Sequence, residues 1–204
     1  MREAAPDALL HVDATQSYMK VPFTVRSLGA DMITLSSHKI EGPKGVGALI
    51  VRQEILKKRG LVPMILGGGQ EDGMRSGTEN LPGIAAFAKA AELAAKNREK
   101  NAQIMESLRA RLLEKIHTDP VLSAIRPVEP AAHAPHILNL TLPGIKSETM
   151  LHYLSSREIY VSSGSACSSN HTHVSSALVA FGRTPAEADT SIRVSFSHRN
   201  TPEE

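Results

Sequence analysis

Lys39 lies where an amine could do chemistry. It follows the apolar run that starts at Ile33 and stands directly behind Ser36 and His38, and a glycine-containing turn then leads into a second apolar run, 46–51. A lysine at such a tip can be a nucleophile toward a carbonyl when its surroundings lower its pKa. The hydroxyl and imidazole groups beside it could hold an anion such as a phosphate. The alternative is a solvated lysine on a loop.

Asp13 and Gln16 form a second candidate pair, directly after the apolar run 8–12. Such a run suits a strand of a parallel sheet that is buried on both faces. Ligands gather at the carboxyl ends of strands in open α/β sheets, although Asp13 could equally be a helix or turn cap. The connection 17–31 is long enough for a crossover. If the strands before Asp13 and Lys39 are parallel neighbours, a carboxylate and an amine point into one crevice.

The single cysteine, Cys167, sits in a loop of small residues, 162–169, after an apolar segment, 159–161, that we expect to be a short strand. Small neighbours leave a sulfur accessible, which a reactive thiol requires, whereas a buried and inert cysteine is the alternative. His171 and His173 lie close by. Three candidate ligands crowded into one short segment, with no second cluster, make a poor metal centre, so no metal site is predicted.

Two further segments carry candidate binding residues. The glycine-rich loop 67–80 runs into a helix beginning near Pro82, so backbone amides beside Thr78 make a natural anion site, with a flexible surface loop as the alternative. Arg193 lies on the polar face of the alternating strand 191–197. Its planar fork could clamp a carboxylate, or it could simply be solvated.

The elements that position these residues fall into two groups. Helical spacing covers 82–96 and 104–116, and we place the domain boundary near Asn97, inside this long helical region. The first group is 1–97 and the second, 98–204, has an α+β pattern. Its expected elements are a strand over 137–142, a helix over 147–157, a short helix closed by Gly182, a helix opened by a capping box at Thr184 and Glu187, and the strand 191–197.

Composition excludes several classes of function. The chain has 204 residues, 41% of them hydrophobic, which is enough for one good core or two small ones. A net charge of +2 and 3% aromatic residues favour neither phosphate tracking nor base stacking, so nucleic acid is not an expected partner. No run is apolar enough to span a membrane and no secretion signal opens the chain. With one cysteine and no internal disulfide, we expect a reducing, cytoplasmic setting.

Four motifs together resemble the cysteine desulfurases, which are pyridoxal-phosphate (PLP) enzymes of fold type I. The resemblance implies an α/β fold: 1–97 as part of the large PLP-binding domain with a mixed or parallel sheet, and 98–204 as a small α+β C-terminal domain carrying the cysteine loop. It also implies that the family's N-terminal half is absent. The motifs are Asp13-Ala14-Thr15-Gln16, Ser36-Ser37-His38-Lys39, Met74-Arg75-Ser76-Gly77-Thr78 and Ser162-Ser163-Gly164-Ser165-Ala166-Cys167.

The same resemblance implies a cofactor role for the residues of the first domain. Lys39 would bind PLP covalently and later act as general base and acid at the substrate Cα. Asp13 would pair with the protonated pyridine nitrogen, and Gln16 would hydrogen-bond the ring hydroxyl. The phosphate would be held by Ser36, His38 and, from the second subunit of a homodimer, Thr78.

For the second domain, the resemblance implies sulfur chemistry on L-cysteine. Arg193 would clamp the substrate carboxylate, and Cys167 would attack the substrate sulfur to give alanine and a cysteine persulfide. A sulfur-acceptor protein such as an iron–sulfur scaffold would take that sulfur, for iron–sulfur cluster assembly or tRNA thiolation. The alternatives are a folded, inactive fragment that binds no PLP, and another fold type I enzyme such as an aminotransferase or a selenocysteine lyase.

Overall fold

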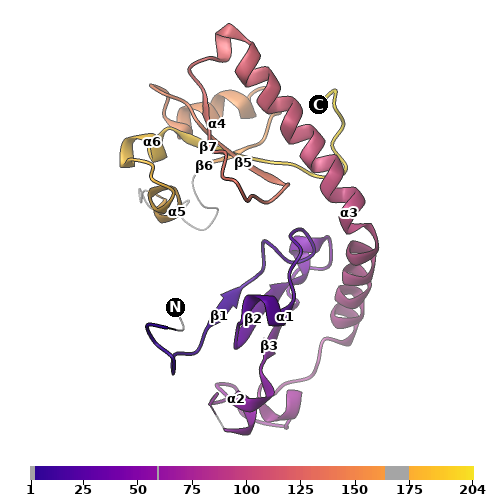
Figure 1. Ribbon diagram of the computed structural model, residues 1–204. Coiled ribbons are helices and arrows are strands. Elements are labelled where there is room, and N and C mark those ends of the chain that lie inside the picture. Colours follow the sequence, from indigo (N-terminus) through magenta and orange to yellow (C-terminus); the bar gives the residue numbers. More distant parts are fainter. Residues whose placement is uncertain (1–2, 59, 164–174) are drawn as a thin grey trace. The chain divides into compact units, whose positions relative to one another are not determined.

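The computed structural model describes residues 3–58, 60–163 and 175–204. The chain divides into two compact units, Met1–Arg98 and Glu99–Glu204 (Figure 1). Each unit has its own β-sheet and its own cluster of buried apolar side chains. In the described ranges, no helix combines the length and the apolar character needed to cross a membrane.

The first unit is built on a mixed three-stranded sheet in the order β1-β2-β3. Strand β1 pairs in parallel with β2, and β2 pairs antiparallel with β3. The strands before Asp13 and Lys39 are therefore parallel neighbours, which is the condition for the two side chains to lie at one end of the sheet, and the short helix α1 lies in the crossover. The bounds are His11–Asp13 for β1, Val25–Leu28 for α1, Met32–Ser36 for β2 and Gly47–Val51 for β3.

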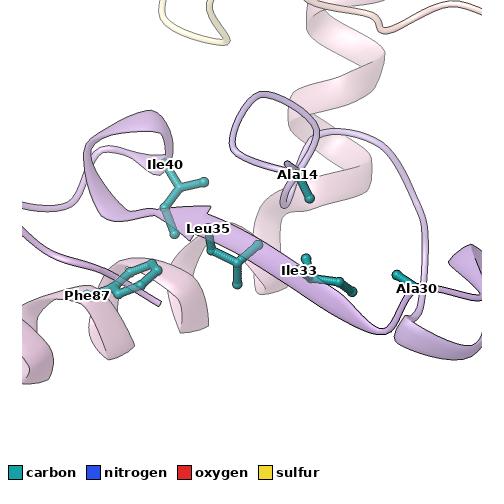
Figure 2. Close-up of a cluster of buried hydrophobic side chains, with 6 residues drawn as sticks. All are labelled: Ala14, Ala30, Ile33, Leu35, Ile40 and Phe87. Atoms are coloured by element: carbon teal, nitrogen blue, oxygen red, sulfur yellow. The ribbon is translucent and has the colours of Figure 1, made fainter. Parts of the chain in front are cut away.

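The core of this unit lies where β2 meets the first turns of the long helix α3, Leu81–Thr118. Ile33 and Leu35 stand two residues apart on β2, so both point to one face, and Phe87 of α3 belongs to the same cluster (Figure 2). Ile40, from the turn after β2, completes the cover over that end of the strand. Burial of these side chains fixes the end of β2, and with it the tip that carries Lys39.

The expectation that the run 8–12 is a buried strand is wrong. Strand β1 has only three residues, its ends His11 and Asp13 are exposed, and Leu9 is 50% exposed. The reason is position in the sheet, because in the described part of the chain β1 is an edge strand with β2 as its one neighbour. An apolar run indicates that a strand is suited to burial, but whether the strand is buried depends on the strands and helices that pack beside it.

The helical region expected around Asn97 is one continuous helix, α3, of 38 residues. Its polar middle, Asn97 to Asn101, contains neither glycine nor proline, so nothing in it ends the helix. Before it lies the short helix α2, Gln53–Lys57, and the glycine-rich loop contains one turn of 3₁₀-helix, η2, Glu71–Gly73.

The second unit contains an antiparallel four-stranded sheet in the order β4-β5-β7-β6. The alternation predicted for β5 and β7 is confirmed: Leu138, Leu140 and Ile192 face a core shared with the last turns of α3 and with α4. The opposite face carries Asn139 and Arg193. The bounds are Arg126–Pro127 for β4, Ile137–Thr141 for β5, Ser147–Ser155 for α4, Ser162–Ser163 for β6 and Ser191–Ser195 for β7, with a 3₁₀ turn, η3, at Pro120–Leu122.

The short strand expected over 159–161 is displaced. The pairing with β7 is made by Ser162 and Ser163, while Ile159 and Tyr160 are 50% and 79% exposed. The apolar residues at 159–161 predicted a strand there, but the residues that pair with β7 are the two serines that follow. The two expected helices that follow are present as α5, Ser176–Ala180, and α6, Pro185–Asp189, and α6 has the predicted capping box.

Candidate active site

Asp13 and the tip 36–39 lie at the same end of the first sheet, where strands β1 and β2 finish. The two strands run in parallel with Asp13 opposite Thr34, two residues before Ser36. The ladder continues past the strand, since the N–H of Ala14 donates to the carbonyl of Thr34 at 3.0 Å. The carboxyl ends of β1 and β2 therefore meet, which is where ligands bind in sheets of this kind.

Asp13 is held as a carboxylate at this edge. Hydrogen bonds from Thr15, first from its hydroxyl and then from its backbone N–H, lower the pKa of Asp13 against the opposing effect of burial, and the charge of His11 adds to them. The Thr15 N–H donates to Asp13 Oδ1 at 2.9 Å. His11 Nε2 also bonds the hydroxyl of Thr34, which ties β1 to β2. Gln16, three residues beyond Asp13, is exposed.

The tip that follows β2 is one turn of 3₁₀-helix, η1, Ser37–Ile40. Ser36 Oγ and His38 Nδ1 are hydrogen-bonded at 2.8 Å, so these two side chains lie together; His38 is exposed and Lys39 is half-buried. Beneath them Ser37 is fully buried, and its backbone N–H donates to the carbonyl oxygen of Val46 at 3.0 Å. These contacts give the tip a defined shape.

Gly42 closes the tip where no side chain would fit. A Cβ at this position would overlap Ser37 Oγ and would lie 3.2 Å from the Cβ of Ala90 in α3. Its backbone N–H donates to the carbonyl of Ser37 at 3.1 Å. The close packing of Ser37 and of the Ala90 side chain against this position explains the glycine at this point of the turn.

Lys20 is a neighbour of Lys39 that the sequence did not indicate. Burial lowers the pKa of Lys20, and the positive charge of Lys39 lowers it further, against a raising effect of Glu41. Lys20 belongs to the crossover between β1 and β2 and stands 19 residues before Lys39, without a motif of its own. Only the fold brings the two amines near one another.

Thr78 is exposed in the loop ahead of α3. Polar groups of the loop hydrogen-bond within it. The Gly77 N–H donates to Gln70 Oε1 at 3.0 Å, and the Ser76 N–H donates to the carbonyl oxygen of Ile65 at 3.1 Å. Thr78 belongs to the first unit, as do Asp13 and Lys39.

Arg193 belongs to the second unit, in the middle of β7. Its Nη2 donates to Ser162 Oγ at 3.3 Å, and it lines a cavity of about 420 Å³ on the unit's own surface. A second guanidinium, that of Arg109 on α3, lines the same cavity and is only 5% exposed. Other lining residues are Asn139, His133, Ser175, Leu178 and Phe181.

Sequence reasoning missed Arg109, Asn139 and His133. Arg109 had a signal: it occupies an apolar stripe of α3 between Met105 and Leu113, where a charge is unexpected. Glu106 connects two of these side chains, with Arg109 Nη1 at 3.5 Å and His133 Nε2 at 3.0 Å. Cys167, together with His171 and His173, lies outside the described residues.

The chain matches the family model Aminotransferase class-V over residues 1–204. It is 40% identical over 205 residues to the NifS/IcsS protein homolog of Lactobacillus delbrueckii subsp. bulgaricus, covering 98% of this chain and 51% of the relative. It is also 40% identical over 197 residues to cysteine desulfurase IscS 1 of Archaeoglobus fulgidus, covering 97% of this chain and 50% of the relative.

Solved structures give the same result. A NifS-like protein superimposes with a TM-score of 0.83 at 34% identity, covering 99% of this chain and 50% of that one. The NifS-like protein of Rickettsia africae gives a TM-score of 0.80 at 34% identity, covering 97% of this chain and 50% of that one. The chain thus spans about half the length of the relatives it matches. Its sequence and its fold place it in the class V aminotransferase family, which is a family of fold type I PLP enzymes.

Proposed function

We propose that this chain is part of a PLP-dependent cysteine desulfurase, with the first unit binding the cofactor and the second carrying the cysteine loop. The observation that carries the proposal is the meeting of Asp13 and the Ser36–Lys39 tip at one edge of the sheet, on adjacent parallel strands. Relatives named cysteine desulfurase match along almost the whole chain. One structural neighbour, SspA, was solved in complex with cysteine, at a TM-score of 0.69 and 30% identity.

The donor set of the first unit fits PLP. A carboxylate with a lowered pKa, Asp13, is suited to the protonated pyridine nitrogen, and the exposed amide of Gln16 is suited to the ring hydroxyl. Ser36 and His38 lie together and offer a hydroxyl and an imidazole to the phosphate. PLP, when bound, supplies an electron sink for the bonds at the substrate Cα. Thr78 of a second copy of the chain would complete the phosphate site.

The chain's own residues then act on L-cysteine. Lys39 would hold the cofactor and carry the proton that leaves and returns at the substrate Cα. Arg193 would bind the carboxylate through its guanidinium. The thiolate of Cys167 would attack the substrate sulfur, so that the carbon–sulfur bond breaks, its electrons remain on carbon, and the products are alanine and a Cys167 persulfide. An acceptor protein would then remove that sulfur.

Alanine release from L-cysteine tests the proposal. The chain is loaded with PLP and assayed alone and mixed with the N-terminal half of the Archaeoglobus fulgidus relative, because the relatives are about twice as long. We expect alanine and protein persulfide in equal amounts, and loss of both in Cys167→Ser with unchanged PLP absorbance. Turnover that survives Cys167→Ser would contradict the persulfide role and favour another fold type I reaction. Failure to load PLP would contradict the proposal as a whole.

A further inference from the structure

Arg193 has a polar side chain directly opposite it on each neighbouring strand. Asn139 of β5 and Ser162 of β6 both pair with Arg193 in the antiparallel register. Side chains directly opposite on antiparallel strands point to the same face, with Cβ atoms about 5 Å apart. Arg193 and Asn139 also line the same cavity. Three polar side chains therefore stand in a row across the cavity face of the sheet.

Two atoms of this row are buried and complementary. Within the described part of the chain, neither Arg193 Nε nor Asn139 Oδ1 has a hydrogen-bond partner, although both are shielded from solvent. One is a donor and the other an acceptor, and their residues face each other across the strands. Leaving both unpaired is destabilising, and a hydrogen bond from Nε to Oδ1 would satisfy both atoms at once. On the other side, Ser162 Oγ already accepts from Nη2.

We propose that Asn139 and Ser162 are positioning residues that hold the Arg193 guanidinium from two sides for a carboxylate ligand. Asn139 Oδ1 accepts from Nε and Ser162 Oγ accepts from Nη2, which leaves Nη1 and the second N–H of Nη2 for the ligand. The inference rests on the proposed role of Arg193 in binding the carboxylate of L-cysteine. A guanidinium fixed in this way loses little further freedom when the anion binds.

The remaining charges around the cavity agree with an anionic ligand. Arg109 is buried at the same cavity and adds a second guanidinium, which lies 3.5 Å from Glu106. Glu106 is also shared with His133, and its side chain is 43% exposed. An anion entering the cavity therefore meets two guanidinium groups, one of them held by the strands on either side.

The test uses the 204-residue chain, acetate as the carboxylate probe, and NMR of ¹⁵N-labelled arginine side chains. The Nε–H resonance of Arg193 is identified by its loss in Arg193→Lys. We expect acetate to shift it to saturation in the wild type. We expect Asn139→Ala to speed exchange of this proton with water and to weaken acetate binding about fivefold, and Ser162→Ala to weaken it about threefold. Asn139→Asp keeps an acceptor in place and should keep the proton protected.

Two matched controls separate positioning from general damage. Asn97→Ala and Ser156→Ala remove side chains that bond nearby carbonyls, of Leu93 and Tyr153, and should leave acetate affinity unchanged. Unaltered Nε–H exchange and affinity in Asn139→Ala would overturn the positioning role. If Asn139→Ala does not fold, Ser162→Ala affinity and Asn139→Asp protection decide the same question. Failure of acetate to bind the wild type would instead overturn the carboxylate role of Arg193.

Discussion

Lys20 and Lys39 are near enough for the charge of one to change the protonation of the other. Burial is the larger cause of the lowered pKa of Lys20, and the charge of Lys39 is the second. Two amines therefore lie near one another in this region, and that of Lys20 gives up its proton more readily than an ordinary lysine. We propose Lys39, and not Lys20, as the reacting amine because Lys39 lies on the tip that follows β2.

The lowered pKa of Lys20 makes stability depend on pH in a defined direction. The unfolded chain holds this proton up to a pKa of about 10.5, whereas the folded chain releases it earlier. Between these two values the unfolded state binds more protons, so the free energy of unfolding rises with pH. In Lys20→Met this rise should disappear and stability near pH 7 should increase, as measured by urea unfolding at several pH values. The exposed Lys44→Met should keep the wild-type slope; equal slopes in both variants would contradict the prediction.

At the scale of the elements, Asp31 links the strands of the first sheet at the end opposite Asp13 and Lys39. Asp31 is 5% exposed, its Oδ2 accepts from the backbone N–H of Leu10 at 2.8 Å, and its Oδ1 lies 3.3 Å from Arg52 Nη1. These contacts join the chain before β1, the start of β2 and the end of β3. One buried carboxylate thus fixes the relative position of the strands that carry Asp13 and Lys39.

Removing that carboxylate should loosen all three strands. We expect Asp31→Ala to lower the free energy of unfolding by about 2–3 kcal/mol, because it leaves a backbone N–H without its acceptor and removes a buried charge partner. Arg52→Ala should cost less than about 1 kcal/mol, since the Arg52 side chain is 53% exposed. Denaturant unfolding followed by circular dichroism compares them, and an equal cost for both would contradict this account of the sheet.

The tip after β2 gives a sharper test of shape. We expect Gly42→Ala to displace Ser37 and weaken PLP retention at least about tenfold, because an added Cβ has no room there. At Gly45 nothing lies within 4 Å, although its φ of +78° disfavours alanine. Gly45→Ala should therefore cost about 1 kcal/mol of stability and retain PLP. PLP absorbance after gel filtration distinguishes the two, and equal retention would show that the tip tolerates displacement.

Sequence patterns predicted the features that depend on residues close in the chain, but not those that depend on which strands lie side by side. The alternation along β5 and β7 and the capping box of α6 depend on residues close in the chain, and both were confirmed. The burial of β1 and the register of β6 depend on which strands lie beside them, and both predictions were wrong. Lys20 and Asn139 were missed for the same reason, because each gains its significance from a residue on another segment.

At the scale of the whole molecule, the first unit exposes an apolar segment before the glycine-rich loop. Val62, Met64 and Leu66 are 84%, 96% and 78% exposed. Contiguous exposed apolar surface of this kind marks interaction sites in soluble proteins. The resemblance to cysteine desulfurases implied a homodimer, and this segment is where we expect a second copy or other chain to bind.

Charges placed on the segment should reduce self-association. In the double variant Met64→Lys and Leu66→Lys, we expect the apparent dissociation constant for self-association to rise about tenfold or more, because burying a lysine in an apolar contact is unfavourable. Sedimentation velocity over a range of concentrations measures it. Val121→Lys, a similarly exposed apolar residue of the second unit at 87%, is the control. The same mass distribution for all three proteins would show that the segment is not an interface.

The most direct test of the central claim is intact and peptide mass analysis after incubation with PLP and reduction by borohydride. The account predicts one added pyridoxyl group, mapped to the peptide that contains Lys39, absent in Lys39→Ala and retained in Lys20→Arg. Lys20→Arg is the necessary control because the lowered pKa of Lys20 makes this lysine the competing amine in the wild type. Labelling that persists in Lys39→Ala and is lost in Lys20→Arg, or no labelling of the wild type, would contradict the assignment of this edge of the sheet as a PLP site.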